Sequence, residues 1–303
     1  MYKTDRTSWF KGIIFFSRKS SINLFYVPVL ILFAVFTAYP LISGVQLSFT
    51  DWDGYTANKA FVGISNYLRL FSDKYFLQVL INTLIFGFGC TILQQIFGLL
   101  LALVLDSKIR GKNFARAIVY LPVLVSPVIM GTMYYLLLQY NNGALNDIVL
   151  YFGGSKTAWL SDSNAAIGAI VFINTVQFMG ISMILYLTGL QSIPVEYYEA
   201  SDIDGASGLQ QFRHITLPLL YPAMVTSVTV NLIGGLKLFD IIKVLTNGGP
   251  GYSTNSVSTY IGITYFNAQS AGYASSMGVI LFLMILIVTL VLNTVLKKKE
   301  VDF

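Results

Sequence analysis

Six long apolar stretches constrain this chain more than any other feature of its sequence. A helix that crosses a bilayer core needs roughly 20 apolar residues. Soluble domains carry about 25% charged residues, whereas this chain is 11% charged and 55% hydrophobic, so it lacks the polar side chains needed to face water on all sides. We therefore expect an all-α membrane protein, a bundle of six transmembrane helices at residues 23–48, 77–105, 114–138, 165–190, 219–244 and 272–296.

The basic residues predict how this bundle is oriented. Connections between successive spans alternate between the two sides of a membrane, and Lys and Arg are enriched on the cytoplasmic side. One side has four of them: Lys59, Arg69, Lys74 and Lys156. The other side, with tails at 1–22 and 297–303, is expected to be cytoplasmic because it has thirteen: Lys3, Arg6, Lys11, Arg18, Lys19, Lys108, Arg110, Lys112, Arg116, Arg213, Lys297, Lys298 and Lys299.

The cytoplasmic connection at 191–218, between the fourth and fifth predicted spans, is polar but has the pattern of a structured loop. Pro194 suits the first position of a short helix, and Gly205 suits its C-terminal stop. Ser207 and Gln210 form a serine-x-x-glutamine pattern, which is typical of a capping box at the start of a second helix. We expect two short helices with a tight turn at Gly205.

Three acidic residues share one face of the first of these helices, because Glu196, Glu199 and Asp202 are spaced by three. Like charges at this spacing weaken an isolated helix by roughly 0.2–0.5 kcal/mol. One interpretation is a solvated acidic face, which the helix dipole favours near the N-terminus. The other is a docking helix that enters a cleft of another protein, with Tyr197, Tyr198 and Ala200 supplying apolar contact.

The sequence around this face resembles the EAA motif of ABC importer permeases. The match consists of Glu199-Ala200-Ser201, Asp204-Gly205-Ala206, Phe212, Ile215, Leu217-Pro218 and Pro222, and it departs mildly at Ser201, where alanine is usual. The resemblance implies that the 191–218 loop is a coupling helix that sits in a groove of a cytoplasmic ATPase. It implies an ATPase-coupling role for Glu196, Tyr198, Glu199, Ala200, Ser201, Asp202, Asp204 and Gly205.

Two further stretches resemble the carbohydrate branch of that family, in its first permease subunit. They are "YPLISGVQLSFTDWDG" with "FVGISNYLRLFSD" (39–54 and 61–73) and "FDIIKVLTNGGPGYST" (239–254). The resemblance extends over 25–296 and implies a transmembrane permease domain at 23–296 in a bacterial cell membrane, which carries a sugar, an oligosaccharide. It also implies three kinds of partner: a second, related permease, two ATPase subunits that bind ATP and Mg²⁺, and an extracellular sugar-binding protein.

Polar residues inside predicted spans are candidates for the transport path, since they are costly in lipid unless they are paired or face water. The fourth span offers Asn174, Gln177 and Phe178, and sugars need both polar groups and flat apolar surface. The fifth span offers Asn231, Gly235, Lys237 and Asp240.

These residues also have a simpler interpretation. In this interpretation Asn174 and Gln177 only bond neighbouring helices, Gly235 only allows close packing, and Lys237 and Asp240 form an internal ion pair.

The motifs of an enzyme are missing from the sequence. It has no G-x-x-x-x-G-K-[ST] phosphate loop, so ATP hydrolysis is expected only in partner subunits, and we expect no metal site, no cofactor and no nucleic-acid partner, with membrane lipid around the spans. The single histidine, His214, lies in the loop without a nucleophile beside it. The alternatives are an importer permease for a non-sugar solute and an ion-coupled secondary carrier, which usually buries several ionisable residues.

Overall fold

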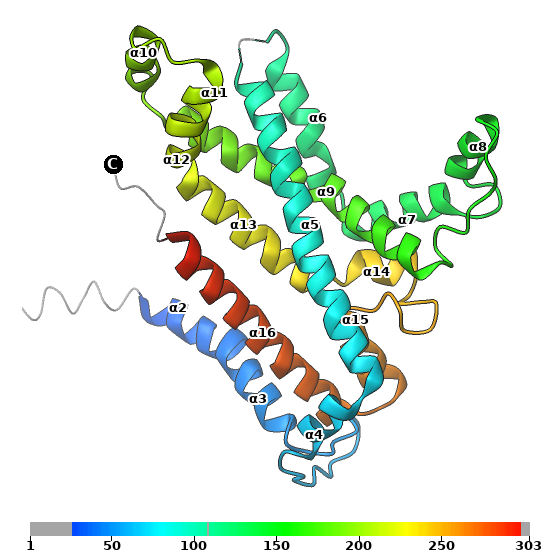
Figure 1. Cartoon of the computed structure of the whole chain (residues 1–303). Coiled ribbons are helices and arrows are strands. Elements are labelled where there is room, and N and C mark those ends of the chain that lie inside the picture. Colours follow the sequence, from blue (N-terminus) through cyan, green and yellow to red (C-terminus); the bar gives the residue numbers. More distant parts are fainter. Residues whose placement is uncertain (1–25, 108, 298–303) are drawn as a thin grey trace, which may run out of the picture.

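The computed structural model describes residues 26–107 and 109–297, which form an all-helical structure (Figure 1). The predicted tail at 1–22 lies outside the described residues, as do residues 298–303. Among the described residues, β-pairing is limited to one isolated antiparallel bridge between Thr50 and Phe61. The expected all-α class is confirmed.

Four helices in the described part of the chain are each long and apolar enough to cross a bilayer, and they follow four of the predicted spans. In the first, a π-helical turn precedes Pro40, and this wider turn accommodates a proline ring that has no N–H to donate. The four are α2–η1–α3 (Tyr26–Phe33, Ala34–Ala38, Tyr39–Leu47), α5 (Lys74–Asp106), α9 (Ser163–Gln191) and α16 (Ala271–Lys297).

The third predicted span, 114–138, is wrong as one continuous helix. The structure has α6 (Lys112–Leu124) and α7 (Pro127–Leu138), and their axes differ by 95°. Pro127 is the reason, because a proline pushes the preceding residue out of the helical region, and Ser126 has a ψ of 134°. Hydropathy alone does not detect this bend, since apolar residues continue on both sides of it.

The fifth predicted span, 219–244, is also interrupted. Helix α13 (Tyr221–Leu236) ends after two glycines, and α14 (Asp240–Leu245) begins only after the non-helical residues 237–239. Within the described residues, four helices have the length and composition of a span, or five if α6 and α7 together form one. The six-span bundle is therefore not established as a set of six continuous helices.

The remaining helices are short. Figure 1 shows α10 and α11 at one end of the molecule and α4 at the other, with α8 set to one side beside α7. The short elements are α4 (Ser65–Ser72), α8 (Ala144–Tyr151), α10 (Glu196–Ile203), α11 (Gly208–Gln211), η2 (Phe212–Thr216), α12 (Leu217–Leu219), α15 (Val257–Gly262) and η3 (Ile263–Asn267).

Close approaches between glycines and neighbouring backbone hold the central helices together. A Cβ added to Gly235 of α13 would lie 2.9 Å from the Cα of Gly87 in α5, and one added to Gly180 of α9 would lie 2.8 Å from the carbonyl oxygen of Val119 in α6. Small residues at such crossings are typical of membrane helices, which lack a hydrophobic driving force for association. Helices α5, α9 and α13 also pack against one another and form the centre of the molecule.

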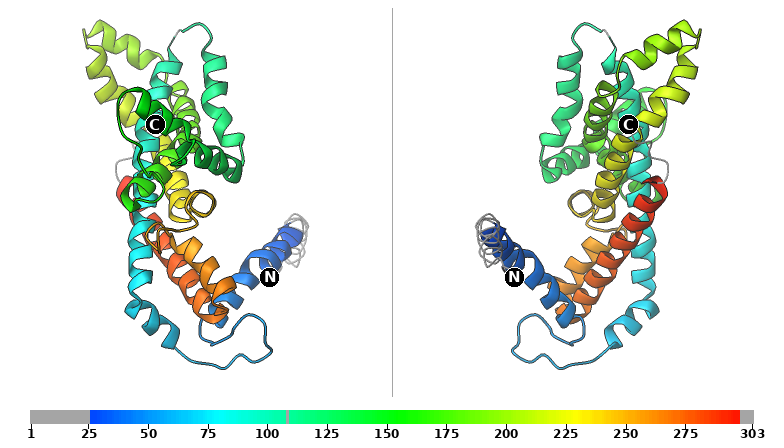
Figure 2. Two further views of the ribbon diagram at one scale, coloured as in Figure 1. Left: turned by 90° about the vertical axis from the view of Figure 1, so that its right-hand side faces the viewer. Right: turned by 90° about the vertical axis from the view of Figure 1, so that its left-hand side faces the viewer.

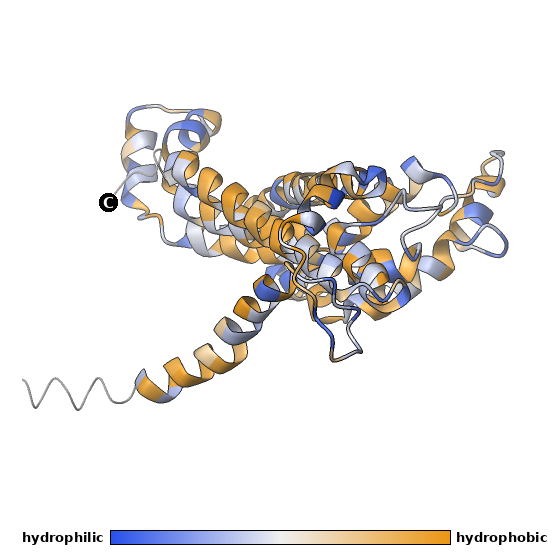
Figure 3. Ribbon diagram, turned by 90° about the horizontal axis from the view of Figure 1, so that it is seen from below, coloured by the Kyte–Doolittle hydropathy of each residue, from blue (hydrophilic) through white to orange (hydrophobic). Residues whose placement is uncertain are grey.

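The first helix leaves this centre. Helix α3 packs against α16, although neither α2 nor α3 has a buried residue, and Figure 2 shows α2 diverging from the other helices. Figure 3 shows that this arm is mainly hydrophobic. A helix that is apolar on all sides needs lipid or protein around it, so this arm is suited to a membrane and not to water.

Candidate functional site

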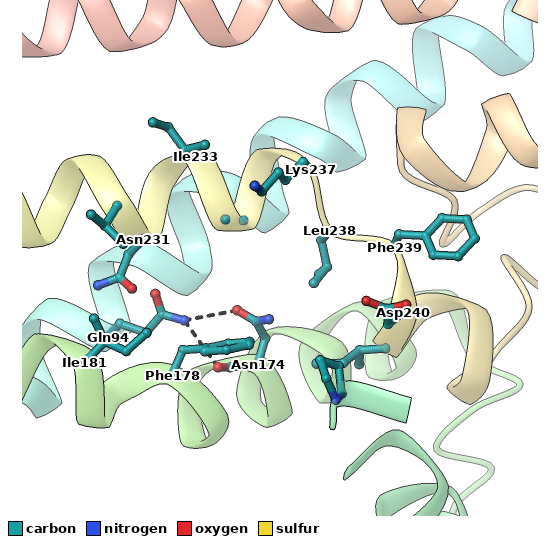
Figure 4. Close-up of a pocket in the computed structure, with 15 residues that line it drawn as sticks. Gln94, Asn174, Phe178, Ile181, Asn231, Ile233, Lys237, Leu238, Phe239 and Asp240 are labelled. Carbon is teal, nitrogen blue, oxygen red and sulfur yellow. Dashed lines mark hydrogen bonds between the residues drawn. The ribbon is translucent and has the colours of Figure 1, made fainter. Parts of the chain in front are cut away.

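A cavity of about 520 Å³ lies where α5, α9 and α13 meet the two helix breaks (Figure 4). Pro127 from the α6–α7 break and Leu238 from the α13–α14 break both line it. Six of the seven predicted transport-path residues do so too: Asn174, Phe178, Asn231, Gly235, Lys237 and Asp240. The sequence reasoning missed four other lining residues of note: Gln94, Pro127, Ile181 and Leu238.

Gln94 of α5 is the most informative of these residues. It is only 2% exposed, and its Nε2 donates to the backbone oxygen of Asn174 at 3.2 Å and to the Asn174 Oδ1 at 3.0 Å. Its Oε1 is buried and has no hydrogen-bond partner. A buried acceptor without a partner costs about 1–3 kcal/mol. Because Gln94 lines the cavity, its Oε1 is suited to accept a hydrogen bond from a hydroxyl group of a solute that displaces the atoms covering it.

Asn231 of α13 is held in place by a polar network that crosses three helices. Its Nδ2 donates to the Ser182 Oγ at 2.6 Å, and the Nε2 of Gln95 donates to the same oxygen at 3.3 Å. The Tyr186 hydroxyl donates to the Gln95 Oε1 at 2.6 Å. These bonds fix the Asn231 side chain at the cavity wall, because each group in the network has its position set by a neighbour.

Lys237 and Asp240 supply the charges at the cavity edge. Both side chains are exposed, and Figure 4 shows them apart from one another at the α13–α14 break. The internal Lys237–Asp240 ion pair, which was the simpler interpretation of these charges, is not found among the described residues. Phe178 and Phe239 add flat apolar surface to the same lining.

Gln177 has a different position from the other candidates. It is fully buried, it does not line the cavity, and its Nε2 donates to the carbonyl oxygen of Val125 at 3.0 Å. Its interpretation as a residue that only bonds a neighbouring helix agrees with this contact, whereas Asn174 both bonds α5 and lines the cavity. Gln94 carries the same sequence signal as Asn174 and Gln177, because it too is an amide side chain inside a predicted span. It could therefore have been predicted as a candidate.

The 191–218 loop folds largely as the sequence predicts. Helix α10 is followed by a turn in which Gly205 has a φ of +75°, and Ser207 and Gln210 form the predicted capping box at the start of α11. Pro194 was expected at the first helical position, but α10 begins at Glu196. Val195 is the N-cap residue, so Pro194 lies just outside the helix.

The predicted coupling residues divide between two sides of α10. Tyr198 and Ser201 are partly buried against the second half of the loop, where the Tyr198 hydroxyl lies 3.0 Å from the Thr216 Oγ1. Apolar side chains are exposed beside the turn, since Ile203 is 87% and Leu209 is 77% exposed. The other predicted coupling residues are all exposed: Glu196, Glu199, Ala200, Asp202, Asp204 and Gly205.

The chain has one histidine, His214, and one cysteine, Cys90. The His214 Nδ1 lies 3.0 Å from the backbone oxygen of Gln210, and Cys90 is buried in α5. Among the described residues, no group of three or more His, Cys, Asp or Glu side chains is arranged to hold a metal ion. The geometry provides a cavity with a few polar groups in a mostly apolar wall and an exposed helical loop, which suits transport of a solute.

Two solved structures share this fold. A bacterial ABC transporter involved in the import of the acidic polysaccharide alginate matches with a TM-score of 0.82 at 23% identity, over 96% of this chain and 98% of the other. A bacterial alginate ABC transporter in complex with an alginate pentasaccharide-bound periplasmic protein matches with a TM-score of 0.80 at 24% identity, over 92% and 94% of the two chains. At these identities the likeness establishes the fold alone.

Sequence comparison adds the family. The probable starch degradation products transport system permease protein AmyD of Thermoanaerobacterium thermosulfurigenes is 33% identical, over 92% of this chain and 94% of the relative. The trehalose/maltose transport system permease protein MalF of Thermococcus litoralis is 35% identical, over 88% and 90%. Residues 94–300 match the family described as "binding-protein-dependent transport system inner membrane component". The chain belongs to this family and is a multi-pass membrane permease of an ABC transporter, a transport subunit and not an enzyme.

Proposed function

We propose that this chain forms the translocation path for a carbohydrate, an oligosaccharide, and that the cavity between α5, α9 and α13 is where the sugar passes. The observation that carries this proposal is the buried, unpartnered Gln94 Oε1 in the cavity wall. Sugars present many hydroxyl groups, each able to donate to such an oxygen. The apolar faces of Phe178 and Phe239 suit the C–H surface of a sugar ring.

The names of relatives support a sugar over another solute. AmyD is described as transporting starch degradation products and the Thermococcus litoralis MalF as transporting trehalose and maltose. The cavity supports a neutral sugar, because its amides are uncharged and its one cation and one anion, Lys237 and Asp240, balance each other. An ion-coupled carrier has little support, since Lys237 and Asp240 are both exposed and do not form a buried relay.

We infer a six-span arrangement with both termini in the cytoplasm, in which the third span is α6–α7 and the fifth is α13–α14. The excess of basic residues on one side supports this orientation. Discontinuous helices are tolerated in membranes where the broken backbone lines a cavity, and both breaks do so here. In this arrangement α10 and the 191–218 loop face the cytoplasm.

Membership of the ABC permease family supports a set of partners. We infer a second, related permease, two ATPase subunits that bind ATP and Mg²⁺, and an extracellular protein that delivers the sugar. The exposed acids of α10 and the exposed Ile203 and Leu209 provide a mixed charged and apolar surface for the ATPase. When ATP closes the ATPases, residues 196–205 transmit the movement to the bundle, which opens outward to accept sugar, and hydrolysis resets it inward.

Co-purification tests this proposal. The tagged wild-type chain is expected to bring a second permease and an ATPase from its native membrane, as identified by mass spectrometry. Glu199→Arg is expected to lose the ATPase but keep the second permease, because it reverses one charge on the exposed face of α10. Asp147→Arg is the matched control, since Asp147 is an exposed acid on α8. A wild-type chain that purifies without any ATPase contradicts the proposal.

A further inference from the structure

Gln211 joins the two halves of the 191–218 loop. Its Nε2 donates to the Ser201 Oγ at 2.9 Å and to the Asp202 Oδ1 at 2.6 Å, and both acceptors belong to α10. The Ser201 Oγ in turn donates to the backbone oxygen of Tyr198 at 2.8 Å. We call the Ser201–Asp202–Gln211 contacts the α10 brace. It joins residues that are nine and ten positions apart in the sequence.

The brace uses the hydroxyl group of Ser201, the position at which the sequence departs from the usual alanine of the EAA motif. An alanine at this position has no side-chain oxygen and therefore accepts nothing from Gln211. Serine supplies an acceptor at the partly buried side of α10, while the acids of α10 remain exposed. The substitution thus adds a bond inside the loop without changing the exposed face.

The orientation of α10 depends on such contacts because the helix is short. It has eight residues and none of them is buried, and helices shorter than about 12–15 residues are marginal in water on their own. Gln211 belongs to the other half of the loop, where α11, η2 and α12 follow one another from Gly208 to Leu219 and lead into α13. A second contact, between Tyr198 and Thr216, joins the same two halves.

We propose that Gln211 is a positioning residue for energy coupling, and that the α10 brace carries the movement of α10 into α13 and so to the cavity wall. The proposal rests on the proposed function, in which α10 docks on an ATPase. Gln211 itself touches neither the ATPase nor the sugar in this account. Without the brace, the Tyr198–Thr216 contact still joins the two halves, but α10 turns more easily at Gly205 and the loop transmits less of its movement to α13.

The test compares transport with ATP hydrolysis in the complete transporter, reconstituted in liposomes with its binding protein. Gln211→Leu is expected to retain the ATPase subunit and its hydrolysis, while the sugar transported per ATP falls about tenfold, the effect of about one lost charge-assisted bond. Gln191→Leu is the matched control, because Gln191 is exposed at the end of α9. It is expected to leave the ratio unchanged.

Three further variants keep the test independent of folding. Gln211→Lys retains a donor for Asp202 and is expected to restore most of the coupling ratio, whereas Gln211→Glu places a carboxylate against Asp202 and is expected to lower it. Ser201→Ala is expected to lower the ratio less than Gln211→Leu, which also loses the bond to Asp202. The double variant is expected to show less than the sum of the two effects, since the Ser201–Gln211 contact is lost in both.

Different results would contradict the proposal for the α10 brace and the proposed function. If wild type binds an ATPase and transports sugar but Gln211→Leu leaves the ratio unchanged, or lowers transport and hydrolysis equally, the brace is wrong and the proposed function stands. If Gln191→Leu lowers the ratio as much as Gln211→Leu, the brace is also wrong. If wild type binds no ATPase, the proposed function is wrong and the brace falls with it.

Discussion

Gln177 donates a hydrogen bond from its Nε2 to the carbonyl oxygen of Val125, 3.0 Å away, at the point where α6 ends. The last carbonyl groups of a helix have no partner within the helix, and in a membrane they find no water. In a continuous helix the Val125 carbonyl would accept a hydrogen bond from the N–H of Ile129, four residues further on, and the break at Pro127 ends that pairing. The amide of Gln177 replaces this lost partner from α9 and so fixes the break that forms part of the cavity wall.

Gln177→Leu is expected to loosen this break and destabilise the protein. Hydrogen bonds between membrane helices contribute on average about 0.6 kcal/mol, and the unpaired Val125 oxygen adds a cost, so we expect a loss of about 1–2 kcal/mol. The measurement is thermal unfolding of the purified complex. Because Gln177 does not line the cavity, sugar affinity is expected to change less than in Asn174→Leu. A larger change in affinity for Gln177→Leu would place Gln177 in the transport path.

Gln94→Leu is expected to raise the KM for sugar uptake about tenfold or more, since a site built to hydrogen-bond a hydroxyl group discriminates strongly when that bond is removed. Uptake kinetics in proteoliposomes measure this. Gln78→Leu is the control on the same helix, because Gln78 is exposed and lies about 24 Å along the axis from Gln94 at 1.5 Å per residue. An unchanged KM in Gln94→Leu would show that the Gln94 Oε1 does not meet the sugar.

The adjacent glycines of α13 provide a matched pair. A Cβ at Gly235 would meet the Gly87 Cα at 2.9 Å and the Phe86 carbonyl oxygen at 3.1 Å, whereas a Cβ at Gly234 meets nothing within 4 Å. Gly235→Ala is therefore expected to destabilise the complex by about 1–3 kcal/mol, as overpacking does, and Gly234→Ala to be nearly neutral. Thermal unfolding of both variants measures the difference. Equal stability of the two would contradict the close approach of α5 and α13.

The sequence was sufficient to predict the long helices and the 191–218 loop, because these depend on local signals. Hydrophobic runs define α5, α9 and α16, and Gly205 with the Ser207–Gln210 box defines the turn and the start of α11. The predicted polar candidates also came together, since Asn174 and Asn231 face one cavity from two helices. Such convergence follows from the cost of placing polar groups in lipid.

The two helix breaks and the contribution of Gln94 in α5 to the cavity wall were not predicted, because they depend on contacts between distant segments. Pro127 is visible in the sequence, but a 95° bend needs α14 and Gln177 to support it. Gln94 becomes a site residue only when α9 lies beside α5 and leaves its Oε1 without a partner. Gln211 and Ser201 meet only after the Gly205 turn reverses the chain.

ATP-dependent uptake by the reconstituted transporter tests the central claim most directly. Proteoliposomes that contain the chain, its co-purified subunits and the binding protein are given labelled neutral oligosaccharides, amino acids and phosphate, with ATP on the ATPase side or without it. We predict that an oligosaccharide alone accumulates, only with ATP, and that collapsing ion gradients has no effect. Accumulation of only a non-sugar solute, or sugar uptake that persists without ATP and stops when ion gradients are collapsed, would contradict the account.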